Sequence, residues 1–174
     1  MNKRYYDKAF TLVELMVTLA IATILLAIAV PSFTDFYENS RSEAASSNIQ
    51  QSLFMARSHA ISYGATVTVC PRSGSKCGTD WINGFDVFID VEGTGSYDST
   101  KDQVIRTIDA FNSNDFIKTS LKSISFNSEG MISGTAGNLQ FIYCPANKAN
   151  ANSKAIEVSV TGKIRKTTGN VNCS

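Results

Sequence analysis

The sequence predicts an α+β fold in which one long N-terminal helix packs on an antiparallel β-sheet domain. The N-terminal part carries an almost wholly apolar run at residues 10–30, and residues 32–62 contain neither glycine nor proline. After Gly64, short segments rich in Val, Ile, Phe and Thr alternate with clusters of turn residues. A long helical pattern followed by a series of strand patterns is typical of the α+β class.

The apolar run is long enough to cross a membrane as a helix. Its 21 residues would span about 31 Å, against a bilayer core of about 30 Å. Three bases and one acid precede it, and a basic flank stays on the cytoplasmic side. No small-residue cleavage site follows the run, which ends at Pro31. We therefore expect a retained transmembrane helix over residues 10–31, with a cytoplasmic N-terminus, rather than a secretory signal.

Residues 32–63 are predicted to continue this helix as an amphipathic segment that ends at Tyr63, before Gly64. The two segments would form one helix of about 50 residues, or ~80 Å. Because proline removes a backbone donor and clashes with the preceding turn, we expect a kink at Pro31. The predicted apolar stripe comprises Phe33, Phe36, Tyr37, Ala44, Ala45, Ile49, Leu53, Ala56, Ala60 and Ile61.

Residues 64–174 are predicted to form a globular β domain of modest size. Turn clusters rich in Gly, Ser, Asn and Asp separate the strand patterns. We expect one antiparallel sheet, which covers the apolar stripe of the outer half of the helix. The six predicted strands lie at residues 65–70, 84–90, 103–109, 123–128, 139–145 and 155–166.

The four cysteines all follow the membrane segment. An even count in an exported domain predicts two disulfides, and four cysteines allow three pairings. We favour Cys70–Cys77, which would close a short loop, together with Cys144–Cys173, which would pin the C-terminal tail. A zinc site is not indicated, because there is no C-x-x-C motif and the single histidine, His59, lies on a helical stretch.

The charge and the motifs exclude several function classes. The chain carries 16 bases and 15 acids, a net charge of +1, which does not favour a whole-protein grip on nucleic acid or anionic lipid. No activated nucleophile and no phosphate-binding glycine loop ahead of a helix is visible. The sequence therefore predicts neither an enzyme nor a cofactor.

An acidic loop runs from Asp90 to Asp102 and also contains Glu92 and Asp98. Carboxylates on a glycine-rich loop could hold Ca²⁺. The spacing does not fit the EF-hand pattern, since the alternation and the final bidentate glutamate are missing. We therefore expect a solvated acidic loop and no metal.

The stretch FTLVELMVTLAIATILLAIAVP resembles the class III signal peptide of type IV pilins and type II secretion pseudopilins. The resemblance implies the type IV pilin fold and a leader peptide at residues 1–9. A prepilin peptidase would cut between Ala9 and Phe10 and methylate the new amino terminus. Glu14 and Pro31 would become mature residues 5 and 22, as the family pattern expects. Ala9 stands where the family usually has glycine.

The segments QSLFMARSHAISYGATVTVCP and WINGFDVFID resemble the minor pilin and pseudopilin H group, which includes GspH-like, FimT-like and FimU-like proteins. The resemblance implies a minor pilin near the tip of a type IV pilus that supports assembly and twitching. Its partners would be other minor and major pilins and the prepilin peptidase. It would sit in the bacterial inner membrane with a periplasmic domain, and later in the extracellular pilus. The alternative is a type II secretion pseudopilin H.

Glu14 is a carboxylate in a segment suited to lipid, at a cost of about 2.5 kcal/mol or more when it is charged there. After cleavage, the free amino group of Phe10 would lie one helical turn before it. The resemblance implies that Glu14 pairs with the N-terminus of a neighbouring subunit and sets the register of the filament. The alternative is a carboxylate that only lies at the membrane interface.

Three bases, Lys163, Arg165 and Lys166, follow Gly162 in a C-terminal stretch with a local charge of +3. They resemble the G-R-x-R element with which some FimT-like pilins bind DNA, although Lys163 replaces the first arginine. This implies binding of double-stranded DNA through side chains that point to solvent. The alternative is that the bases solubilise an edge strand.

Overall fold

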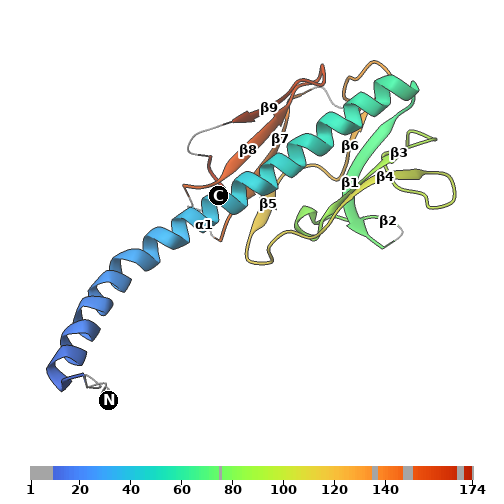
Figure 1. Ribbon diagram of the computed structural model, residues 1–174. Helices are drawn as coiled ribbons and strands as arrows, with labels where there is room; N and C mark the ends of the chain where they lie inside the picture. The colour runs from blue at the N-terminus through green and yellow to red at the C-terminus, as the bar shows by residue number, and fades with distance from the viewer. Residues whose placement is uncertain (1–9, 75, 135–136, 147–150, 168–170, 174) are drawn as a thin grey trace, which may run out of the picture. The chain divides into compact units, whose positions relative to one another are not determined.

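The computed structural model describes residues 10–74, 76–134, 137–146, 151–167 and 171–173. One long helix precedes nine strands and a short 3₁₀ helix in this described part (Figure 1). The helix is α1 (Leu12–Tyr63) and the 3₁₀ helix is η1 (Trp81–Asn83). The strands are β1 (Val67–Ser73), β2 (Lys76–Cys77), β3 (Phe85–Ile89), β4 (Gln103–Ile108), β5 (Phe116–Lys118), β6 (Ile124–Phe126), β7 (Leu139–Cys144), β8 (Lys154–Val158) and β9 (Ile164–Thr167).

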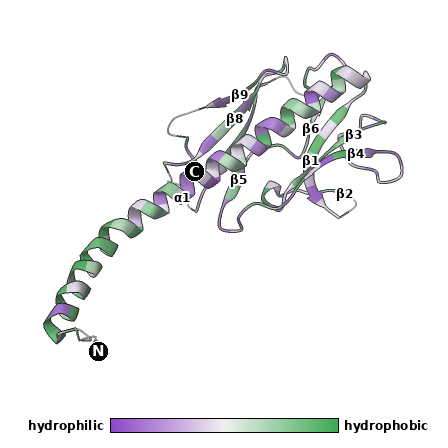
Figure 2. Ribbon diagram, in the orientation of Figure 1, coloured by the Kyte–Doolittle hydropathy of each residue, from purple (hydrophilic) through white to green (hydrophobic). Residues whose placement is uncertain are grey.

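The chain divides into two compact units, residues 1–37 and residues 38–174. In the first unit, α1 is strongly apolar (Figure 2), and α1 is a helix long and apolar enough to cross a membrane. The large apolar side chains of residues 10–37 are all exposed, from Phe10 at 81% to Val17 at 52%. The helix continues through Pro31; the kink expected there stays a prediction.

In the second unit, α1 buries one narrow face, which is partly polar. The predicted apolar positions Ala45, Ile49, Leu53, Ala56 and Ala60 are buried, and Ser42, Ser46 and Ser52 share their face. The other members of the predicted stripe are exposed, so the predicted apolar stripe was wider than the face that the helix buries. Small residues on this face let the backbone of the helix approach the sheets closely.

The helix ends where the sequence predicted. Gly64 has a φ of +62°, a left-handed conformation that glycine adopts without steric cost. The N–H of Ala65 donates to the carbonyl of Ala60 at 3.3 Å. This is the long hydrogen bond of a Schellman C-cap, so Gly64 both stops the helix and turns the chain into β1.

The strands form two antiparallel sheets, not the single sheet that we expected. One has the order β2-β1-β3-β4, with β6 also paired to β1, and the other has the order β5-β7-β8-β9. The predicted strand at residues 155–166 is in fact the hairpin β8–β9. Gly162, at a φ of +75°, makes its turn, and the N–H of Ser159 donates to the carbonyl of Lys163 at 2.9 Å. The short strands β2 and β5 carry too few residues to show a period of two.

The main core lies between α1 and both sheets. Val67, Val87, Phe126, Phe141 and Ile156 are fully buried in it. Trp81 packs edge-on against Phe141 with ring centroids 4.8 Å apart, and its indole N–H donates to the carbonyl of Leu121 at 2.8 Å. The indole therefore closes the core with its polar atom satisfied.

A second, smaller cluster involves the C-terminal tail. Ile142, Cys144, Ala155 and Cys173 are buried together, with Phe116 and Val171 packed against them. On β7, Phe141 and Tyr143 belong to one face and Ile142 and Cys144 to the other, because side chains alternate along a strand. The residues around Cys173 therefore cover the face of the four-stranded sheet that is turned away from the main core.

Arg57 of α1 ties together two turns from different sheets. Its Nε donates to the carbonyl of Gly130 at 3.0 Å, and its guanidinium reaches the carbonyl of Thr161 at 3.4 Å. A side chain at position 162 would collide with the carbonyl of Gly130 and with Arg57. Gly162 is thus required for this close approach as well as for the hairpin turn.

Candidate functional site

Glu14 lies in the first turn of α1 and is bound by Thr11. The Thr11 backbone N–H and hydroxyl donate to Glu14 Oε2 at 3.1 and 2.9 Å, and the Glu14 N–H donates to the Thr11 hydroxyl at 3.2 Å. This reciprocal arrangement is a capping box, which satisfies backbone donors that a helix start leaves open. The carboxylate therefore has a partner within its own chain.

The two predicted processing residues, Ala9 and Phe10, fall on either side of the boundary of the described residues. Phe10 is 81% exposed and directly precedes Thr11. Ala9 and the rest of the predicted leader, residues 1–9, lie outside the described residues. The carboxylate of Glu14 lies one helical turn from Phe10. In the described chain, no other protein side chains cover this first turn of α1.

Pro31, the second assembly residue that the resemblance implies, sits inside the helix. It has no N–H to offer to the carbonyl of Ala27, the usual partner four residues earlier. One turn away, the hydroxyl of Thr34 donates to the carbonyl of Val30 at 3.1 Å. This back-bonding satisfies the Thr34 hydroxyl within the apolar helix, and such bonds often bend helices.

The structure contains both disulfides that the sequence analysis favoured. Cys70 and Cys77 link β1 to β2, with Cα atoms 5.5 Å apart. Cys144 and Cys173 link the end of β7 to the C-terminal tail, with Cα atoms 6.2 Å apart. The second disulfide holds the small outer cluster in place.

A buried carboxylate that the sequence analysis missed connects α1 to β7. The side chain of Asp115 is fully buried and accepts from Arg41 Nη2 at 2.7 Å, from the Ala146 N–H at 3.0 Å and from the Tyr143 hydroxyl. Burial and the hydrogen bond to Asp115 raise the pKa of Tyr143 far above its usual range. Arg41 and Asp115 are 74 residues apart, so no local pattern could reveal this pair.

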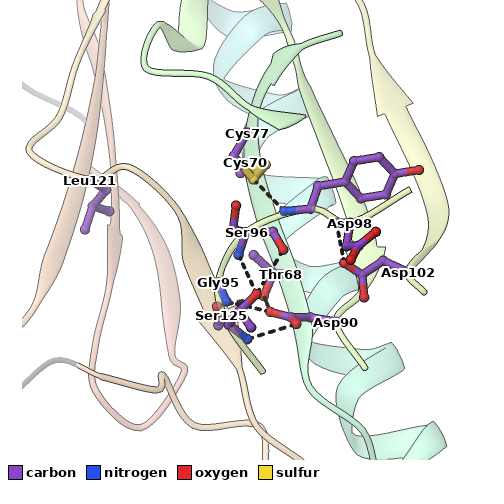
Figure 3. The surroundings of a disulfide bond; sticks show 12 residues. Thr68, Cys70, Cys77, Asp90, Gly95, Ser96, Asp98, Asp102, Leu121 and Ser125 are labelled. Atoms are coloured by element: carbon purple, nitrogen blue, oxygen red, sulfur yellow. Dashed lines mark hydrogen bonds between the residues drawn. A yellow bond between two sulfur atoms is a disulfide. The ribbon is translucent and has the colours of Figure 1, made fainter. Parts of the chain in front are cut away.

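The acidic loop is held together by its own carboxylates (Figure 3). Asp90 is only 2% exposed and accepts from the Thr68 hydroxyl at 2.9 Å and from the N–H groups of Thr94 and Gly95 at 3.0 and 2.8 Å. Asp102 accepts from the N–H of Val91 at 3.0 Å. The expectation of a solvated loop is therefore wrong for Asp90, whose buried carboxyl organises the loop through these hydrogen bonds.

The other two acids of the loop also have partners inside it. Asp98 accepts from the Thr100 hydroxyl and N–H at 2.6 and 2.9 Å, and these hydrogen bonds lower the pKa of Asp98. Glu92 pairs with Lys101, and this hydrogen bond raises the pKa of Lys101. The described residues contain no cluster of three or more metal-ligating side chains.

The three C-terminal bases do not share one surface. Lys163 and Arg165 are exposed, but the side chain of Lys166 is only 15% exposed and pairs with Glu43 of α1. The expectation that all three point to solvent is therefore wrong for Lys166, because neighbouring residues on a strand face opposite sides. Arg165 also lies directly opposite Glu157 of β8, an acid that offsets its charge.

A family profile described as "Type II transport protein GspH" matches residues 45–162, more than half of the chain. The chain belongs to the GspH family. A second profile, described as "Prokaryotic N-terminal methylation motif", matches residues 4–30. Together they confirm the pilin and pseudopilin H resemblance that the sequence analysis proposed.

Solved structures of pilin-type proteins share this GspH-family fold. The type IV minor pilin FimU of Pseudomonas aeruginosa superimposes with a TM-score of 0.64 at 18% identity, covering 80% of this chain and 99% of that one. The minor pseudopilin EpsH of the type 2 secretion system of Vibrio cholerae gives a TM-score of 0.52 at 10% identity, covering 74% and 97%. At such identities the likeness concerns the fold, which confirms the predicted pilin architecture.

One curated relative extends the comparison to sequence. The type IV major pilin protein PilA of Myxococcus xanthus is 32% identical over 78 residues, which cover 41% of this chain. The match spans only 36% of that relative's own length. The GspH family and this fold are those of pilins and pseudopilins, which are structural proteins.

Proposed function

We propose that this protein is a minor pilin of a type IV pilus, processed by a prepilin peptidase and incorporated near the filament tip, where it supports assembly and twitching. The observation that carries the proposal is the state of Glu14. It lies in the first turn of α1, whose apolar residues up to position 37 are exposed. It also lies inside the methylation motif, and its carboxylate accepts hydrogen bonds from Thr11.

A carboxylate at such a position suits a switch between two partners. In the membrane, the capping box lowers the cost of the charge by giving it two hydrogen bonds. Cleavage before Phe10 creates an ammonium group, whose attraction for a carboxylate is strong in a low-dielectric setting. A neighbour's amine then replaces or joins Thr11 as the partner of Glu14, and this pairing sets the register of the new subunit.

The exposed apolar helix supports the same proposal. In lipid, its side chains face acyl chains at no hydrophobic cost. In a filament, the same side chains would pack against the helices of other subunits. The helix thus serves first as a membrane anchor in the inner membrane and then as part of the filament core, while residues 38–174 form a compact unit of their own.

A type II secretion pseudopilin H is the second candidate, and the GspH match favours it. Both roles use the same processing, the same carboxylate and the same helix, so local geometry does not separate them. The separating experiment is deletion of the gene, with piliation, twitching, protein secretion and DNA uptake measured in parallel. We expect loss of piliation and twitching with normal secretion. Loss of secretion with normal piliation would reject the minor pilin in favour of the pseudopilin.

A DNA-binding role would use the exposed pair Lys163 and Arg165. Two bases beside Glu157 form a weaker phosphate site than the three that the motif suggested, since non-specific affinity grows with the number of phosphate contacts. In the deletion strain, reduced DNA uptake with normal piliation would favour this role. We expect any uptake defect to follow the piliation defect instead.

A further inference from the structure

A small apolar strip lies on the outer face of the sheet β5-β7-β8-β9, turned away from the main core. Phe116 stands opposite Cys144, and Ile142 stands opposite Ala155, so these four side chains form one patch on three neighbouring strands. Cys144, Ile142 and Ala155 are buried, and Phe116 is half-buried. Another part of the chain therefore covers this outer face, which keeps its apolar side chains away from water.

The cover is the segment 171–173, which is called the strap below. It belongs to no helix or strand. Val171 and Cys173 pack on the strip, and the disulfide joins Cys173 to Cys144. The Ser153 hydroxyl lies 3.1 Å from Cys173 Sγ, and the hydroxyl is the donor because a disulfide sulfur carries no proton. The strap thus lies outside the hydrogen-bond ladder that holds the strands of the sheet together.

The covalent bond keeps the strap in place. Ordering a segment of three residues costs conformational entropy, and the only large apolar side chain of the strap is the half-buried Val171. A cross-link lowers this cost, because it keeps the segment beside the strip in every conformation of the chain. Without the cross-link, the contacts of the strap do not offset the entropy that its ordering costs.

The rest of the sheet is held by other contacts. The main core contains neither cysteine of this pair, although β7 contributes Phe141 to it. The end of β7 has a tie of its own, since the Tyr143 hydroxyl and the Ala146 N–H both donate to the buried Asp115. The strands therefore keep their places when the strap is released.

We propose that the strap is a latch that oxidation closes. With the Cys144–Cys173 disulfide formed, the strap seals the strip. With the two thiols reduced, it leaves the strip while both sheets and the main core stay folded. The proposal is independent of the filament in which the protein serves.

Closure of the latch needs a disulfide-bearing oxidant. One cysteine thiolate of the pair attacks the disulfide of the oxidant, and the other then displaces the oxidant from the mixed disulfide as a dithiol. Two electrons and two protons thus pass from the cysteine pair to the oxidant. Once closed, the disulfide is shielded from attack, because Cys144 is 0% and Cys173 3% exposed.

Hydroxyl-radical footprinting of the full chain in lipid nanodiscs, read by mass spectrometry, measures the state of the latch. Radicals oxidise the phenylalanine rings that solvent reaches. Phe116 therefore reports on the strip. Phe126 and Phe141 report on the main core, in which both are fully buried.

The variant Cys144→Ala/Cys173→Ala removes the latch, and Cys70→Ala/Cys77→Ala is the matched control, because it removes the disulfide of the other sheet. We expect oxidation of Phe116 to rise several-fold in the first variant and to stay at the wild-type level in the control. The two core phenylalanines should stay protected in both. An unchanged Phe116 overturns the proposal, and so does an equal rise in the control. Oxidation of the core rings overturns it as well, since the core would then depend on the latch.

The wild-type protein tests whether the latch is reversible. A dithiol reductant should raise the oxidation of Phe116, and a disulfide oxidant should lower it again. Differential alkylation follows the redox state of each cysteine pair, and Phe116 should change in step with Cys144 and Cys173. A rise that follows the pair Cys70 and Cys77 instead, or one that reoxidation does not reverse, would overturn the proposal.

Discussion

Residues 10–37 and residues 38–174 differ in where their apolar side chains find cover. In the second unit, Val67, Phe126 and Phe141 are fully buried against other parts of the same unit. Among residues 10–37, every large apolar side chain is exposed, including Leu12, Ile24 and Phe33. The second unit can therefore supply its own stability, whereas the first depends on lipid or on other subunits.

This difference shows that the two units respond to different kinds of substitution. A change in residues 38–174 acts on folding, because it alters contacts within one chain. A change among the exposed apolar side chains of residues 10–36 removes no buried contact within the chain. Its effect should appear in association.

The largest expected effect is on Glu14. Glu14→Ala should leave membrane insertion intact, since it removes a polar group from the apolar helix, but should reduce the protein in sheared filaments to background. Glu14→Gln separates the two roles of the side chain, because its amide oxygen can still accept the hydrogen bonds of the capping box but carries no charge. Immunoblots of membranes measure the insertion of each variant, and immunoblots of sheared filaments measure its assembly. If Glu14→Gln assembles normally while Glu14→Ala does not, helix capping and not charge pairing is the function of Glu14.

Within residues 38–174, the buried ion pair should matter most. Asp115→Ala leaves Arg41 and the Tyr143 hydroxyl without their buried partner, and such a loss costs about 3–5 kcal/mol of unfolding free energy. Asp109 is the matched control, because its ion pair with Arg72 is exposed, with the Asp109 side chain 94% accessible. Asp109→Ala should change stability little. Urea unfolding of the fragment 38–174 measures the free energy of unfolding of both variants. Equal losses would show that Asp115 contributes no more to stability than an exposed ion pair does.

The two disulfides should differ in the stability that they provide. Their cysteines are 29 and 7 residues apart, and chain entropy alone gives about 3.6 kcal/mol for the longer loop and about 2.4 kcal/mol for the shorter one. The double change Cys144→Ser/Cys173→Ser should therefore lower the unfolding free energy more than Cys70→Ser/Cys77→Ser. Urea unfolding of the same fragment gives both values. The reverse order would mean that the outer cluster around Cys173 adds no stability.

The smallest effect concerns the C-terminal bases. Because Lys166 is engaged by Glu43, any DNA binding should depend on Lys163 and Arg165 alone. With two phosphate contacts, log K should fall with log salt at a slope of about −1.8. In a gel shift of the fragment 38–174, Lys163→Ala/Arg165→Ala should remove binding and Lys166→Ala should leave it unchanged. An equal loss with Lys166→Ala would show that the three bases act together after all.

The sequence predicts this fold where the signals are local. The apolar run, the glycine after Tyr63 and the branched residues of β1, β3 and β7 each specify an element through its own period or end. The division into two sheets was not predictable, because it depends on which strands meet. The hairpin β8–β9 was read as one strand, since TG within AIEVSVTGKIRK is a weak turn signal without the contact between Gly162 and Arg57.

The residues of the candidate site could likewise be predicted only where the signal is local in the sequence. Glu14 and Phe10 belong to a short motif, so the sequence places them directly. Asp115 and Arg41 come together only in the fold. The basic residues were grouped by their nearness in sequence, and the strand period then separated Lys166 from Lys163 and Arg165. Asp90 likewise lies in an acidic run, but it is buried and accepts hydrogen bonds from Thr68, Thr94 and Gly95. The amino-acid composition of the run does not reveal these partners.

The central claim is that residues 10–37 leave the membrane and enter a filament after processing. The most direct measurement is mass spectrometry of the protein from sheared filaments, compared with the membrane fraction. We predict a filament form that begins at Phe10, carries a methyl group on its amino terminus, lacks residues 1–9 and contains two disulfides. A protein found only in membranes with Met1 intact, or a chain that begins after Val30, would contradict the claim.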